Sequence, residues 1–128
     1  MRYFRTALLF VSLGGTAVAG PFDGLYRQTA ETDCTQVGGE NGALRIEGGI
    51  FYGAELECRM SNPVNVIDME AKLYTMQCSN DETAWTERAM VLEAAEGRGI
   101  IMVWDGYAFQ YDACQASDAV TAASEGDG

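Results

Sequence analysis

The stretch Ile100-Ile101-Met102-Val103-Trp104-Asp105-Gly106-Tyr107-Ala108-Phe109-Gln110-Tyr111 decides the fold of this chain. Asp-Gly favours a two-residue type I′ turn, because both central residues of that turn need positive φ and the flanking runs here are apolar and aromatic. The sequence therefore predicts a β-hairpin whose loop is Asp105 and Gly106.

That loop fixes the register of the predicted hairpin, which pairs Trp104 with Tyr107 and continues outwards to Ile100 with Tyr111. Strand side chains alternate between the two faces, so the large side chains share one face: Ile100, Met102, Trp104, Tyr107, Phe109 and Tyr111. We call its aromatic members, Trp104, Tyr107, Phe109 and Tyr111, the aromatic wall. It is either a core wall or the lining of a ligand cup. Large apolar residues elsewhere in the chain could pack against it and favour the core: Leu56, Met60, Met69, Leu73, Met90 and Leu92.

The 128 residues suffice for one domain. Residues 1–19 have the pattern of a signal peptide, with Arg2 and Arg5 before a short apolar run and Ala17-Val18-Ala19 as the cleavage site. The sequence predicts export to a periplasm or to the outside of the cell, with no membrane anchor after cleavage. Residues 20–114 then form a single β domain, and residues 115–128 a disordered acidic tail.

The four cysteines, Cys34, Cys58, Cys78 and Cys114, predict two disulfides in an exported domain of this size. A zinc site is disfavoured, because the chain has no C-x-x-C pair and no histidine, and no cofactor is expected. The sequence leaves open all three ways of pairing the four cysteines. In a strict up-and-down meander Cys78 would lie at the opposite end from the other three, so either a strand is missing from the count or Cys78 lies mid-strand.

Period-2 alternation predicts an all-β fold. An opening strand over residues 22–27 is followed by a loop over 28–42 and by strands over 43–47, 50–60, 67–78 and 84–96, with the hairpin last. Pro63 is expected to end its strand, and a change of phase predicts a β-bulge near Tyr74-Thr75. A helix over 82–96 is the alternative to the strand there. Because such a series must hide its edges, we expect a small antiparallel up-and-down barrel or barrel-like sandwich of about seven strands.

The formal net charge of −11 argues against nucleic acid and anionic membranes as partners. The acidic residues either form a solubilising coat on an exported protein or attract a basic partner protein. The lack of histidine removes the usual general base, so the sequence predicts no enzyme. Arg88 stands out, because its predicted face also carries Met90 and Leu92. It either extends to solvent or lies at the rim of a cup, ready for an anionic ligand.

Four segments resemble a group of small exported four-cysteine β-proteins of Gram-negative bacteria that has no assigned function: Asp23-Gly24-x-Tyr26, residues 58–64, residues 73–79, and Trp104-x-Gly106-Tyr107 followed by Cys114. The resemblance implies the compartment and the fold class and supplies no functional residue.

Two functions fit these observations. The first is a non-catalytic module that engages another protein through its acidic outer faces and loops, for example as an inhibitor of a cationic enzyme. The second is a lipocalin-like carrier of a small apolar ligand, with the aromatic wall lining its cavity. A domain this small leaves little interior, which favours the first.

Overall fold

A computed structural model describes residues 20–115, which form nine strands and one short 3₁₀ turn, η1 (Ala95–Gly97). The predicted signal peptide and almost all of the predicted tail lie outside the described residues. None of the described residues forms a helix that is long and apolar enough to cross a membrane. The strands are β1 (Gly24–Arg27), β2 (Asp33–Val37), β3 (Gly42–Glu47), β4 (Ile50–Tyr52), β5 (Glu57–Asn65), β6 (Ala71–Ser79), β7 (Ala84–Glu93), β8 (Gly99–Trp104) and β9 (Tyr107–Ala113).

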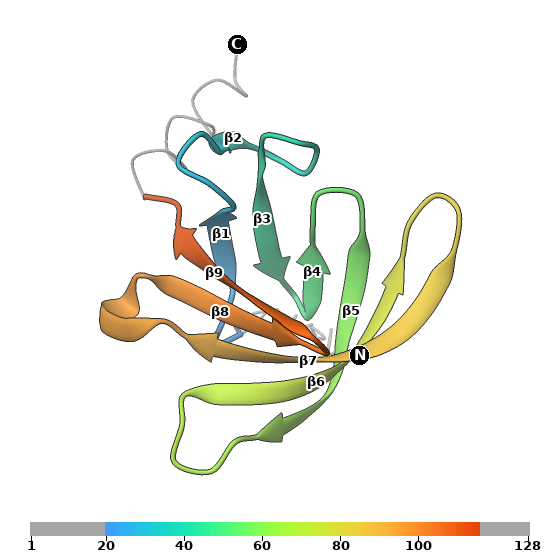
Figure 1. Cartoon of the computed structure of the whole chain (residues 1–128), viewed down its shortest axis with the longest axis vertical. Coiled ribbons are helices and arrows are strands. Elements are labelled where there is room, and N and C mark those ends of the chain that lie inside the picture. The colour runs from blue at the N-terminus through green and yellow to red at the C-terminus, as the bar shows by residue number, and fades with distance from the viewer. Residues whose placement is uncertain (1–19, 116–128) are drawn as a thin grey trace, which may run out of the picture.

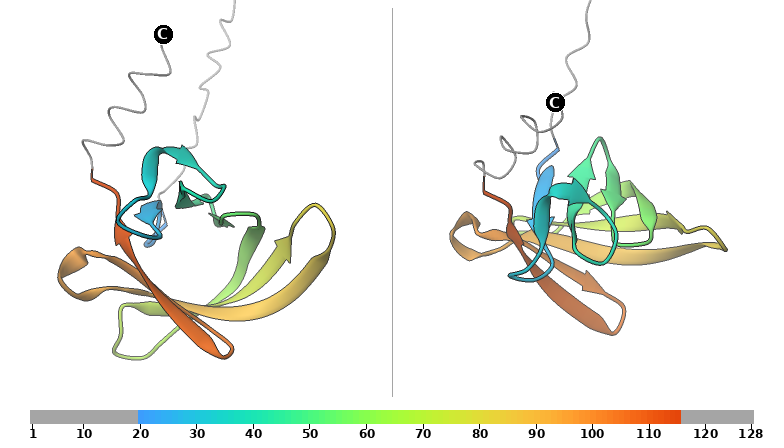
Figure 2. Two further views of the ribbon diagram at one scale, coloured as in Figure 1. Left: turned by 45° about the horizontal axis from the view of Figure 1, so that its top comes forward. Right: turned by 90° about the horizontal axis from the view of Figure 1, so that it is seen from above.

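Eight antiparallel strands close into a barrel, which confirms the predicted fold class. The order is β1-β9-β8-β7-β6-β5-β4-β3, and β1 also pairs with β3 to complete the ring. The ninth strand, β2, runs parallel to β3 outside this ring. Strands β5 to β9 form a curved trough, and strands β1 to β4 lie across its opening (Figures 1 and 2).

The structure has nine strands where about seven were predicted, for two reasons. The expected loop over residues 28–42 contains β2, a strand that was not predicted because this segment is polar. The expected strand over residues 50–60 is two strands, because a turn over 53–56 interrupts it, with the Gly53 N–H donating to the Leu56 carbonyl at 2.8 Å. This turn changes the phase, so Phe51 is buried on β4 while Cys58 is buried on β5.

The register of the predicted hairpin is confirmed pair by pair, but the predicted type I′ turn is wrong, because only Gly106, with φ 98°, has positive φ and Asp105 does not. Strands β8 and β9 meet in the register Trp104↔Tyr107, Val103↔Ala108, Met102↔Phe109, Ile101↔Gln110 and Ile100↔Tyr111. The strand over 84–96 is also confirmed as β7, and no helix forms there.

Proline 63 does not end its strand. Strand β5 continues to Asn65 through a β-bulge between Ser61 and Val64, where Asn62 has φ 50°. A bulge accommodates proline because the extra residue leaves a backbone N–H out of the ladder. The predicted bulge at Tyr74-Thr75 therefore belongs to the opposite strand, and β6 itself runs regularly beside β7.

The predicted inward faces near this bulge are also wrong. Residues 66–70 form a turn rather than a strand, which leaves Ile67 86 % exposed and Met69 51 % exposed. On β6 the inward side chains are Tyr74, Met76 and Cys78, so Leu73 lies on the outer side of the sheet.

The barrel interior is filled from β6, β7 and β8. Met76, Val91 and Met102 are fully buried, and the aromatic rings of Phe22, Tyr26, Phe51 and Tyr74 pack around them. On β7 the inward residues are Ala89 and Val91, which reverses the predicted face of Met90 and Leu92. Alternation alone allows either set of alternate residues on β7 to face the interior. The cross-strand pairs Ala89↔Trp104 and Val91↔Met102 decide it, because Ala89 and Val91 lie on the same face as the large inward side chains of β8.

Two disulfides are present, as predicted: Cys34–Cys114 and Cys58–Cys78. Cys58 and Cys78 are direct cross-strand partners on β5 and β6, an arrangement that the uninterrupted meander did not allow. Cys34 joins β2 to the end of β9 across 80 residues of sequence. Both bonds indicate folding in an oxidising environment outside the cytoplasm.

The two disulfides differ in how exposed their cysteines are to a reductant, and this difference predicts which bond is reduced first. Cys58 and Cys78 lie in the core, whereas Cys114 is only half-buried. Because exchange needs a thiolate to reach a sulfur atom, mild reductant should open Cys34–Cys114 first in the folded protein. Alkylation followed by peptide mass spectrometry measures this order. Early labelling of Cys58 or Cys78 would contradict it.

Candidate functional site

The aromatic wall divides between core and surface. Trp104 and Tyr111 pack against the core, whereas Tyr107 is 52 % exposed and Phe109 is 46 % exposed. The rings form a continuous row, with centroid distances of 6.5 Å for Trp104–Tyr107, 5.3 Å for Tyr107–Phe109 and 5.8 Å for Phe109–Tyr111. Phe51 on β4 continues the row at 6.2 Å from Trp104. The wall is therefore both a core element and an accessible surface.

This row borders a hollow of about 240 Å³ at one end of the barrel, which we call the aromatic cup. It is bounded by β9 on one side, by the turn between β4 and β5 on another, and by the start of β7. The lining residues are Gln28, Leu44, Phe51, Gly53, Ala54, Leu56, Cys78, Trp85, Glu87, Trp104, Tyr107, Phe109 and Tyr111.

The pairing of the strands explains why the barrel is open here. Strand β1 meets β9 only at Asp112 and Ala113, so the segment from Tyr107 to Tyr111 has β8 as its one paired neighbour among the described strands. Strand β7 begins five residues before Ala89, where its pairing with β8 starts. Both segments therefore extend beyond the closed part of the ring, and their inward side chains face the cup.

Glu87 is the one charged residue in the lining of the cup. Its Oε2 accepts a hydrogen bond from the indole Nε1–H of Trp85 at 2.5 Å, and both side chains are half-buried on the inward face of β7. Within residues 20–115, Glu87 forms no ion pair with a lysine or an arginine; the ion pairs there join Arg45 to Glu47 and Arg98 to Glu96. The cup thus holds one fixed negative charge among aromatic rings.

Burial raises the pKa of Tyr111 to about 12, and the neighbouring Tyr107 adds to the effect. The phenol of Tyr111 is therefore neutral throughout the physiological range. It contributes an aromatic face and a hydroxyl to the cup, and no charge.

Arg88 does not belong to this site. It is exposed on the outer face of β7, opposite Thr75, because the phase of β7 places Trp85 and Glu87 inside. Of the two predicted positions for Arg88, the structure shows the one in solvent and not the one at the rim of a cup. The sequence analysis does not single out Trp85 and Glu87, although the alternation Trp85-x-Glu87-x-Ala89-x-Val91 identifies them when this phase of the strand is taken as inward.

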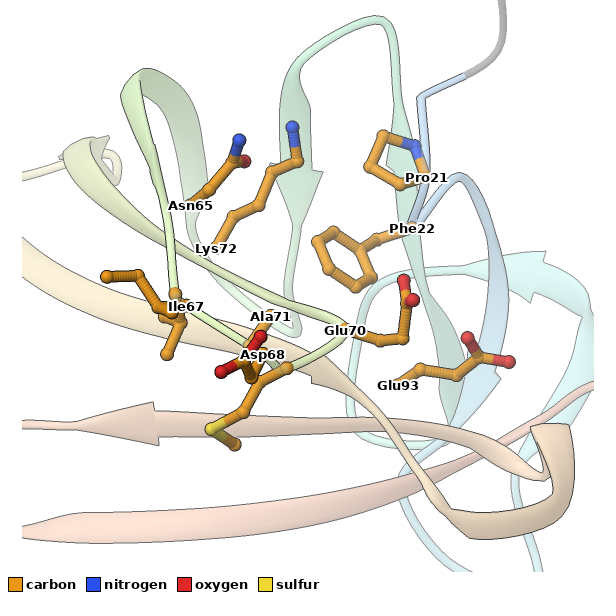
Figure 3. Close-up of a pocket in the computed structure, with 11 residues that line it drawn as sticks. Pro21, Phe22, Asn65, Ile67, Asp68, Glu70, Ala71, Lys72 and Glu93 are labelled. Atoms are coloured by element: carbon orange, nitrogen blue, oxygen red, sulfur yellow. The ribbon is translucent and has the colours of Figure 1, made fainter.

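A second hollow, of about 430 Å³, lies at the opposite end of the barrel, where β6 begins and β7 ends. Figure 3 shows the ring of Phe22 within it, with the carboxylates of Glu70 and Glu93 on one side and the amine of Lys72 on the other. It is the larger hollow, but Phe22 is buried and closes the barrel beneath it, and the exposed turn over residues 66–70 forms much of its wall. We assign the candidate site to the aromatic cup, because the buried ring of Phe51 in the barrel interior is part of its lining.

Within residues 20–115 no group of three His, Cys, Asp or Glu side chains is placed to hold a metal ion. No protein-family model, curated protein or solved structure matches this chain.

The unequal exposure of the aromatic rings predicts that alanine substitutions will lower the free energy of unfolding by different amounts. Tyr107→Ala and Phe109→Ala should each lower the free energy of unfolding by only about 1 kcal/mol, because half of each side chain is already in water. Trp104→Ala should cost about 3 kcal/mol or more, because its ring packs against the core. Urea unfolding measures both. Equal costs would show that the cup is closed in solution.

The tyrosines predict a decline in stability at high pH. The pKa is about 12 for Tyr26 and Tyr111 in the folded protein, against an ordinary value of 10.0. Since the folded-state pKa is raised, the stabilisation is complete below pH 10 and is lost as the pH rises towards 12. Phenolate absorbance should show these late-titrating groups, and Tyr111→Phe should remove one. Titration of every tyrosine near pH 10 in the folded protein would contradict this prediction.

Proposed function

We propose that this protein is a non-catalytic binding module, located in a periplasm or outside the cell, that engages a basic partner protein through the aromatic cup. An inhibitor of a cationic enzyme is the form of this role that suits a small, disulfide-linked scaffold. The observation that carries the proposal is the row of accessible rings around the single carboxylate of Glu87.

The size of the cup favours a protein partner. Its volume of about 240 Å³ is below the roughly 300–1,000 Å³ of pockets that enclose a drug-sized ligand. A hollow of this size suits a single inserted side chain, with the surrounding surface in contact with the rest of the partner. Tyr and Trp are also the side chains that most often supply binding energy at protein interfaces.

The charge of the chain supports a basic partner. A net charge of −11 attracts a cationic protein over distances of up to about 10 Å at moderate salt, which speeds association. The cup adds a specific contact to this general attraction. The two disulfides keep the scaffold rigid, which lowers the entropic cost of binding.

The carrier of a small apolar ligand is the weaker alternative. Glu87 would have to be desolvated beside an apolar molecule with no compensating charge, which costs free energy. A small molecule that stays bound to the purified protein in native mass spectrometry would favour the carrier.

Capture from a periplasmic extract, with the wild type and matched variants as bait, tests the proposal. The Tyr107→Ala/Phe109→Ala double variant should lose a basic partner that the wild type retains, and high salt should weaken the capture. The Ile67→Ala/Met69→Ala double variant is the control, because it removes exposed apolar side chains at the opposite end of the barrel. Each captured protein is identified and its binding is remeasured in purified form. A partner that binds both double variants equally would contradict a role for the cup.

A further inference from the structure

We propose that the aromatic cup holds a guanidinium group, the side chain of an arginine on the partner, between its rings and the carboxylate of Glu87. This inference rests on the proposed function and names the group that the cup recognises. It follows from three features of the cup: the faces of its rings, its single charge, and the orientation of that charge.

The rings supply attraction for a cation. The face of an aromatic ring carries negative potential, and tryptophan is the strongest of the three aromatic side chains in this interaction. Trp85 and Trp104 both line the cup, together with Tyr107 and Phe109. The chain itself offers an example of such a contact, since the guanidinium of Arg45 lies 5.2 Å from the ring centroid of Tyr52.

Glu87 supplies the compensating charge. Its Oε2 is engaged by Trp85, which fixes the direction of the carboxylate, and among the described residues no donor is bonded to Oε1. A carboxylate that is half-buried and lacks an ion-pair partner favours a ligand that brings both positive charge and N–H donors. Neither a neutral apolar group nor an anion meets that requirement.

Arginine fits better than lysine. The guanidinium is planar, stacks on aromatic faces and is more weakly hydrated than an ammonium, so less free energy is lost when it enters the cup. Its several N–H donors can reach Glu87 while the plane rests on a ring. A lysine ammonium would have to give up a tightly held hydration shell for one carboxylate oxygen.

Tryptophan fluorescence of the protein itself can show whether a group is bound in the aromatic cup. The chain contains two tryptophans, and both line the cup, so intrinsic fluorescence responds directly to a bound group. The experiment titrates the oxidised protein with short blocked peptides of one sequence that carry arginine, lysine, leucine or citrulline at the central position. Citrulline is the neutral counterpart of arginine with nearly the same shape.

The arginine peptide should change the tryptophan emission in a saturable way, with lysine weaker and citrulline and leucine weaker still. Glu87→Gln should weaken arginine binding by about tenfold or more, because a charge-assisted hydrogen bond is lost. Glu93→Gln is the matched control, since it makes the same change of charge on the inward face of β7 at the opposite end, and it should have little effect.

Three results would overturn the inference. Binding of citrulline, leucine or lysine as tight as that of arginine would show that the cup does not select a guanidinium. Unchanged arginine binding in Glu87→Gln would remove the carboxylate from the site. A lack of response to every peptide would show that the cup takes no single side chain. The capture experiment with Tyr107→Ala/Phe109→Ala is independent of these results, so failure of the guanidinium and failure of the binding module are distinguishable.

Discussion

The pairing of β1 with both β9 and β3 is the constraint on which the rest of the structure depends. Three residue pairs join β1 to β3 and two join it to β9, and these close the barrel. Closure removes the open sheet edges that would otherwise invite association. Because β1 has only four residues, it closes the ring along part of its length, while β7 and β9 extend further. The partial closure creates the aromatic cup.

The two strands of the hairpin have different surroundings. On β8, which pairs with β7, Ile100 and Met102 are buried and complete the core. On β9, Tyr107 and Phe109 share the same face, but this part of β9 has no second paired neighbour among the described strands, and both rings stay exposed. One alternating pattern thus completes the core from β8 and presents accessible aromatic rings from β9, where we propose that the partner binds.

The sequence predicted the barrel, the hairpin register and the existence of two disulfides, because these depend on strand alternation, on the position of the Asp105-Gly106 turn and on the cysteine count. It failed where the outcome depends on contacts between distant strands. Alternation alone does not say which face of β7 is inside; that choice is made by Met102 and Trp104 on β8. The same limit misplaced Arg88 and hid Glu87. Pro63 predicts the end of a strand, because a proline at a β-bulge and a proline just after a strand have similar local sequences.

The central claim is that the open end of the barrel holds a cationic side chain, and the indole N–H resonances of Trp85 and Trp104 test it most directly. In a ¹H–¹⁵N spectrum of the oxidised protein, addition of a blocked arginine peptide should shift both indole signals and the backbone amides of the hairpin tip around Tyr107. Shifts confined to the opposite hollow, at Ile67, Met69 and Lys72, would contradict the account.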